Sequence, residues 1–111
     1  MNTMTIKGYQ AIIAFDPDIQ MFRGEFVGLN GGADFYATDV NGLKCEGEIS
    51  LKVFLEACAE DGVEPRKHFS GKFSLRVAPA THEIATLVAA AHGQSLNQWA
   101  SEAIRHAALA G

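Results

Sequence analysis

Residues 72–77 alternate strictly between polar and apolar side chains, in the order Lys72-Phe73-Ser74-Leu75-Arg76-Val77. Because successive side chains of a strand point to opposite faces, this alternation predicts one strand with an apolar face and a polar face. Two helical patterns follow it. The first begins at Pro79, and the second begins after Gly93, where Ser95 and Gln98 have the spacing of a capping box. The last part of the chain is therefore predicted to be strand, helix, turn, helix.

This predicted unit needs a second copy of itself. Its 41 residues are too few to bury a sound core alone, and one strand cannot form a sheet. The simplest solution is a two-fold dimer in which two copies of residues 72–77 pair antiparallel and four helices pack behind them. We predict that the dimer core contains Phe73, Leu75, Val77, Leu87, Leu96, Trp99 and Ile104.

The polar face of the predicted strand is a candidate DNA-binding surface. Lys72, Ser74 and Arg76, doubled by the two-fold symmetry, would form an exposed ribbon. A two-stranded ribbon fits the major groove of DNA. The alternative is an ordinary solvated strand face, and the two helical patterns that accompany the strand favour DNA contact.

Upstream residues predict a separate α+β part. Strand patterns cover residues 9–15, 19–27 and 33–37, and a helix capped by Thr38 or Asp39 continues to Gly62. Residues 64–71 are expected to form a connector, because they contain Pro65, Ser70 and Gly71. The predicted domains are residues 1–68 and residues 69–111.

Composition limits the possible classes of protein. The chain has 111 residues, 48% of them hydrophobic and 20% charged, which is typical of a globular protein and not of a disordered or collagen-like one. The apolar runs are too short for a membrane-spanning helix, and residues 1–7 lack the apolar region of a secretory signal. We therefore expect a cytoplasmic protein with no membrane partner. Cys45 and Cys58 are expected to be free, buried or half-buried thiols on one helix.

Charge is distributed unevenly between the two parts. Residues 1–70 carry six basic and eleven acidic side chains, a net charge of −5, whereas residues 71–111 carry three basic and two acidic side chains, a net charge of +1. The acidic part favours a basic partner, and the other part favours an acidic partner such as nucleic acid.

The segment from Lys72 to Ala108 resembles a ribbon-helix-helix module of the Arc/MetJ type, most clearly at Ser95-Leu96-Asn97-Gln98-Trp99. With the upstream motifs, the chain resembles the HicB-type antitoxins that carry a ribbon-helix-helix tail. The upstream motifs are Tyr9 to Phe15, Asp16-Pro17-Asp18, Phe22-Arg23-Gly24, Gly62-Val63-Glu64-Pro65 and Ser70-Gly71-Lys72-Phe73.

The resemblance implies a fold and a function. The N-terminal part would be a reduced ribonuclease-H-like β-β-β-α domain without nuclease activity, which blocks a small basic HicA-like toxin that cleaves messenger RNA. The C-terminal dimer, or a dimer of dimers, would bind operator DNA and repress transcription. Lys72, Ser74 and Arg76 would contact bases. The backbone N–H groups of Ser95, Leu96 and Asn97 would bind a phosphate.

Two alternatives remain. The first is an orphan DNA-binding regulator without a toxin, in which the N-terminal domain serves oligomerisation or ligand sensing. The second is a metal-dependent nuclease that uses Asp16, Asp18, Asp34 and Asp39, although turn and helix-cap positions explain these residues without any metal. Cys58 and His68 would act as a nucleophile and its base only if the fold happened to bring the two side chains together. We expect no catalytic residue, no metal and no cofactor.

Overall fold

The structure is a computed structural model that describes residues 2–111. Its contacts divide the chain into two compact units, with the division between Ser70 and Gly71. No helix within residues 2–111 has the length and apolar character that crossing a membrane requires.

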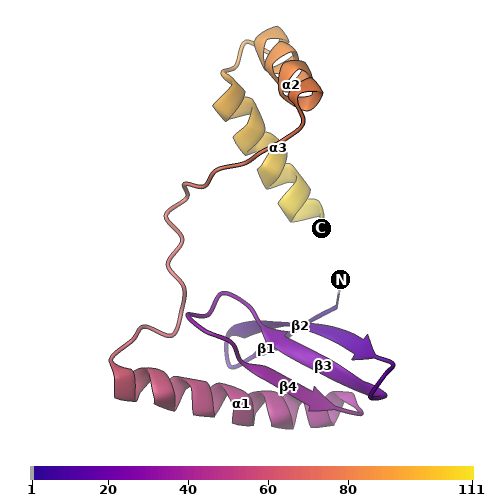
Figure 1. The fold of residues 1–111 in the computed structure, drawn as a ribbon, viewed down its shortest axis with the longest axis vertical. Helices are drawn as coiled ribbons and strands as arrows, with labels where there is room; N and C mark the ends of the chain where they lie inside the picture. Colours follow the sequence, from indigo (N-terminus) through magenta and orange to yellow (C-terminus); the bar gives the residue numbers. More distant parts are fainter. Residues whose placement is uncertain (1) are drawn as a thin grey trace. The chain divides into compact units, whose positions relative to one another are not determined.

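The first unit contains a four-stranded antiparallel sheet whose strand order, β1-β2-β3-β4, is the order of the chain (Figure 1). The strands are β1 (Thr3–Ile6), β2 (Tyr9–Asp16), β3 (Met21–Phe26) and β4 (Asp34–Ala37). The prediction of three strands was wrong, because β1 precedes them. A tight turn at Lys7 and Gly8, with φ of 51° and 82°, folds β1 back onto β2. The unit is therefore β-β-β-β-α and not β-β-β-α.

Helix α1 (Val40–Asp61) packs across one face of this sheet. It begins where the Asp39 carboxylate accepts a hydrogen bond from the Gly42 N–H, and it ends at Gly62, whose φ of 67° is left-handed. The predicted helix and both of its ends are confirmed. The residues buried between α1 and the sheet are Ile6, Ala11, Phe26, Leu29, Ala33, Phe35, Ala37, Leu43 and Leu51.

Two glycines allow α1 and the sheet to approach closely. A β-carbon at Gly47 of α1 would collide with the side chain of Ile6, and one at Gly24 of β3 would collide with the ring of Phe35. Phe35 is only 3% exposed and stacks against Phe26, with ring centroids 5.2 Å apart. The core is therefore built around an aromatic ring that occupies the space two glycines leave open.

The segment after α1 returns to the first unit. The Lys67 N–H donates to the Gly28 carbonyl (2.8 Å), and the Asn30 N–H donates to the Pro65 carbonyl (2.9 Å). The Arg66 guanidinium lies 3.9 Å from the centroid of the Tyr9 ring. The prediction that residues 64–71 are a connector was therefore wrong for residues 65–67, which hydrogen-bond to the loop between β3 and β4 or stack on β2.

The second unit contains α2 (Pro79–Ala91) and α3 (Leu96–Ala110), which contact each other. Gly93 follows α2 with a φ of 68°, and Ser95 caps α3. Both predicted helices are confirmed. Residues 72–78 form neither helix nor strand, so the strand predicted over residues 72–77 is absent from the single chain. A strand exists only when another strand pairs with it, and the predicted partner was the same segment of a second chain.

Candidate functional site

The residues predicted to contact bases lie just before α2. Lys72, Ser74 and Arg76 are exposed, as is expected of side chains that reach a ligand. The alternating apolar residues are exposed too: Phe73 by 70%, Leu75 by 65% and Val77 by 45%. The single chain therefore leaves both faces of this segment uncovered.

The residues predicted to bind phosphate lie together at the start of α3. The Gln98 N–H donates to Ser95 Oγ (3.1 Å), and the Ser95 N–H donates to Gln98 Oε1 (3.0 Å), which completes the predicted capping box. The first N–H groups of a helix have no partner within the helix. Leu96 and Asn97 are the first two residues of α3, so their N–H groups are available to an anion.

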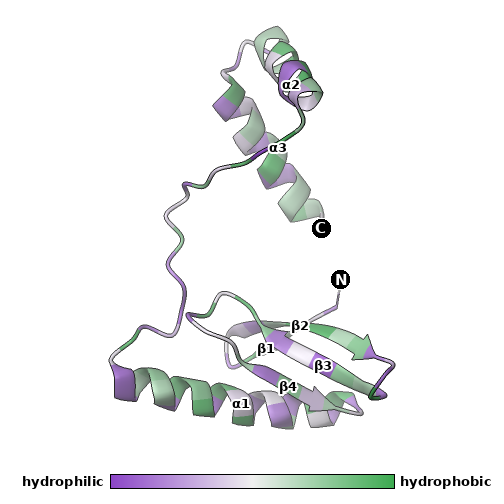
Figure 2. Cartoon of the chain, in the orientation of Figure 1, coloured by the Kyte–Doolittle hydropathy of each residue, from purple (hydrophilic) through white to green (hydrophobic). Residues whose placement is uncertain are grey.

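The predicted dimer core remains open in the single chain. Leu87 is 70% exposed and Ile104 is 43% exposed, whereas Leu96 and Trp99 are half-buried. Figure 2 shows apolar stretches on both helices of this unit. Ala89 is the one buried residue among residues 71–111. The second unit thus presents most of its large apolar side chains without covering them.

One basic side chain of this unit is already engaged within α3. The Glu102 carboxylate lies 3.0 Å from Arg105 Nη2 and 3.4 Å from His106 Nε2. The hydrogen bond and the positive charge of Arg105, with a smaller contribution from His106, lower the pKa of Glu102. Arg105 therefore has a local structural partner, whereas Arg76 lies in the segment outside the helices.

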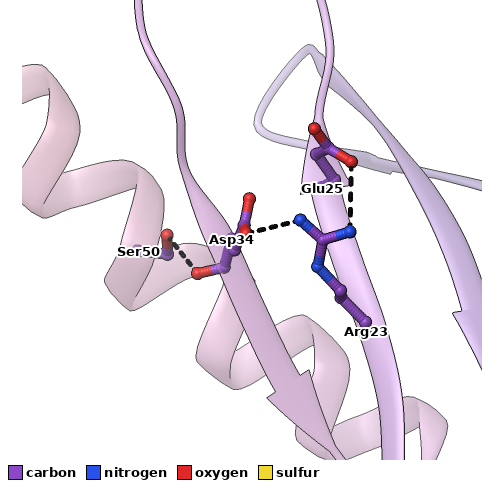
Figure 3. A network of polar contacts seen from close by, with 4 residues as sticks. All are labelled: Arg23, Glu25, Asp34 and Ser50. Carbon is purple, nitrogen blue, oxygen red and sulfur yellow. Dashed lines mark hydrogen bonds and ion pairs between the residues drawn. The ribbon is translucent and has the colours of Figure 1, made fainter. Parts of the chain in front are cut away.

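The first unit has a sheet face that carries a charged cluster, opposite the face that α1 covers. Arg23 lies between two carboxylates, with Nη2 2.7 Å from Asp34 Oδ2 and Nη1 3.4 Å from Glu25 Oε2 (Figure 3). The hydrogen bond and the charge of Asp34 are the main causes that raise the pKa of Arg23. Two acidic groups surround one basic group, so this cluster has a net negative charge. The cluster was not predicted from the sequence, although Arg23 and Glu25 alternate with apolar residues.

Three of the four aspartates considered for a nuclease have separate side-chain roles in the structure. Asp16 accepts a hydrogen bond from the Asp18 N–H (3.0 Å) in the turn after β2, Asp34 pairs with Arg23, and Asp39 caps α1. In the part of the chain that the structure describes, no group of three or more His, Cys, Asp or Glu side chains is placed to hold a metal ion.

Both cysteines are free and lie on α1. Cys58 is buried, as predicted, whereas the prediction was wrong for Cys45, which is exposed.

Comparison with protein families adds one finding. Residues 54–104 match the model of the HicB family, which is a family of antitoxins. The matched residues include the end of α1, the segment before α2 and most of the second unit. A search of curated proteins and a search of solved structures found no match. Over these residues the chain is therefore similar to antitoxins of toxin–antitoxin systems.

Proposed function

We propose that the chain is an antitoxin that represses transcription, with a C-terminal ribbon-helix-helix dimer that binds operator DNA and an N-terminal domain that neutralises a small mRNA-cleaving toxin. One observation supports the proposal most strongly. The segment of residues 72–77 and the two helices that follow it expose an apolar surface in the single chain, within a region that largely matches an antitoxin family.

The dimer follows from that apolar surface. Pairing residues 72–77 of two chains antiparallel would satisfy their backbone hydrogen bonds and turn Phe73, Leu75 and Val77 onto the four helices. Burying a large apolar side chain stabilises the dimer by about 1.5–3 kcal/mol relative to leaving it in water. The second unit would thereby gain the core that it lacks alone.

DNA binding follows from the opposite face of the same ribbon. Lys72, Ser74 and Arg76 of both chains would project into the major groove, where an arginine pairs with guanine through two hydrogen bonds. The N–H groups of Leu96 and Asn97, with Ser95 beside them, would hold a backbone phosphate. Because each unit has three basic side chains and one is engaged with Glu102, a second dimer on the same operator would strengthen binding.

Toxin neutralisation is assigned to the first unit. Its net charge of −5 complements a basic protein that binds RNA, and covering the RNA-binding face of such a protein would block cleavage. In this proposal the chain is not itself an enzyme, and it needs neither metal nor cofactor.

A fluorescence-anisotropy titration against the DNA upstream of the chain's own gene tests the repressor role. Replacing Arg76 with Ala should remove about 1–3 kcal/mol of discrimination between this DNA and a scrambled duplex. Arg105→Ala is the matched control, because Arg105 belongs to the same unit but is engaged with Glu102. Equal sequence preference in wild type and Arg76→Ala would contradict the ribbon assignment.

Co-expression with the product of the adjacent reading frame tests the antitoxin role. A small basic protein that arrests growth alone, and is harmless when this chain is present, would support the proposal. Arrest that continues in the presence of this chain would contradict it.

A further inference from the structure

An open groove runs along the outer edge of the sheet, between β4 and α1. It has a volume of about 630 Å³, and its lining includes Tyr36, Glu46, Ile49, Ser50, Val53 and Phe54. Ile49 is 57% exposed and Val53 is 61% exposed, although both lie beside the core helix face. The groove therefore has an apolar floor that nothing in the first unit covers.

The strand beside this groove can accept another strand. β4 is an edge strand, since it pairs with β3 alone. The Phe26 N–H donates to the Ala33 carbonyl, and in an antiparallel ladder the bonded pairs alternate. The backbone groups of Asp34 and Tyr36 consequently point away from β3. The Asp34 carbonyl accepts the Ser50 hydroxyl (3.0 Å), which leaves Tyr36 to offer an N–H and a C=O at the edge.

The charges of the groove favour a basic occupant. Of its two acidic lining residues, Asp34 turns its carboxylate to Arg23 on the sheet face that α1 does not cover, so Glu46 is the charged side chain that the groove presents. Asp34 is paired with Arg23, whereas Glu46 has no ion-pair partner within residues 2–111. The groove on the other side of α1 is balanced, because Lys7 and Lys52 line it together with two glutamates. Pairing two copies of this chain through β4 would bring like charges together, which disfavours self-association at this edge.

We propose that the groove between β4 and α1 binds an extended, basic segment of a protein partner as a fifth strand. Main-chain hydrogen bonds to Tyr36 would align the segment, its apolar side chains would rest on Ile49 and Val53, and its Lys or Arg side chains would approach Glu46. That the natural partner is the toxin rests on the proposed function. That the bound segment is extended and basic is inferred from the groove alone.

A peptide tests the groove without the natural partner. The probe is a fluorescent decapeptide in which Lys alternates with Val, titrated into the full-length chain and followed by anisotropy. Glu46→Lys should weaken its binding by about tenfold or more, because a like charge then faces the peptide. Glu56→Lys is the matched control, since Glu56 is an exposed glutamate of α1 that lines the other groove.

Two further measurements identify strand addition. Hydrogen exchange of the Tyr36 amide should slow when the peptide binds, and a peptide with N-methylated alternate amides should fail to bind because it lacks the donors of a strand. The proposal is overturned by the absence of peptide binding, by equal binding to Glu46→Lys and Glu56→Lys, or by unchanged Tyr36 exchange. A co-expressed toxin that still forms a complex with Glu46→Lys would reject the groove and retain the proposed function.

Discussion

The two units of the chain treat their apolar residues in opposite ways. The first unit encloses Phe26, Phe35 and Leu43 between a sheet and a helix, whereas residues 71–111 bury only Ala89. Hydrophobic content does not explain the difference, because the second unit has Leu87, Ile104 and other large apolar residues in helical rows. The difference is topological. Four strands and a helix can close around a core, but two helices and an unpaired segment cannot. In the proposed dimer, the second unit would gain its stability from another chain.

The largest effect that tests this comparison is expected at Phe35. Phe35→Ala should lower the free energy of unfolding of the first unit by about 3–5 kcal/mol, because it empties the space between Gly24 and Gly47. Urea unfolding measures the loss, which should not depend on protein concentration. Phe69→Ala is the control, since Phe69 is 72% exposed and its removal should change little. A concentration-dependent loss at Phe35 would show that the first unit also needs a partner.

A smaller effect of a different kind is expected at Leu87. Leu87→Ala should weaken the dimer by about 1.5–3 kcal/mol per chain, since Leu87 would leave water only when two chains associate. Analytical ultracentrifugation over a dilution series measures the dissociation constant. Val63→Ala, which removes an exposed apolar side chain from the first unit, provides the comparison. If both variants dissociate like wild type, the apolar surface of α2 is not the dimer interface.

The smallest effect is local and concerns the start of α3. Ser95→Ala should cost about 1 kcal/mol, because the Gln98 N–H loses its cap. Thermal melting followed by circular dichroism at fixed protein concentration measures the loss. Ser101→Ala is the matched control, because an exposed serine inside a helix gains helix propensity when it becomes alanine. Equal melting of the two variants would mean that the capping box does not stabilise α3.

Much of this fold can be predicted from local patterns. Both ends of α1 and the start of α3 were predictable, because Asp39, Gly62 and the pair Ser95 and Gln98 act through hydrogen bonds with residues close in sequence. β1 was missed because it has only four residues and because Lys7 is an unusual residue for a turn that needs positive φ at both positions.

Features that depend on distant residues were harder to predict. The hydrogen bonds that join residues 65–67 to the loop before β4 link residues far apart in sequence, and most are made by backbone atoms, with one added by the Asn30 side-chain amide. The groove beside β4 did have a signal, because Ile49, Val53 and Ala57 form a second apolar row on α1 with a spacing of four. The row alone does not identify a binding partner, because the binding surface also includes the edge of β4, which a sequence pattern on α1 does not define. The DNA-contact residues stay a prediction.

The strand order of the sheet has a consequence for the kinetics of folding. Each strand pairs with the strand that precedes it in the chain, and α1 follows last. Contacts between near neighbours in sequence close short loops, which favours rapid folding, and a chain emerging from the ribosome can make them in order. The first unit can thus mature during synthesis. In the proposed dimer, the second unit would form only after two chains meet, so its assembly rate should rise with the rate of translation of the gene.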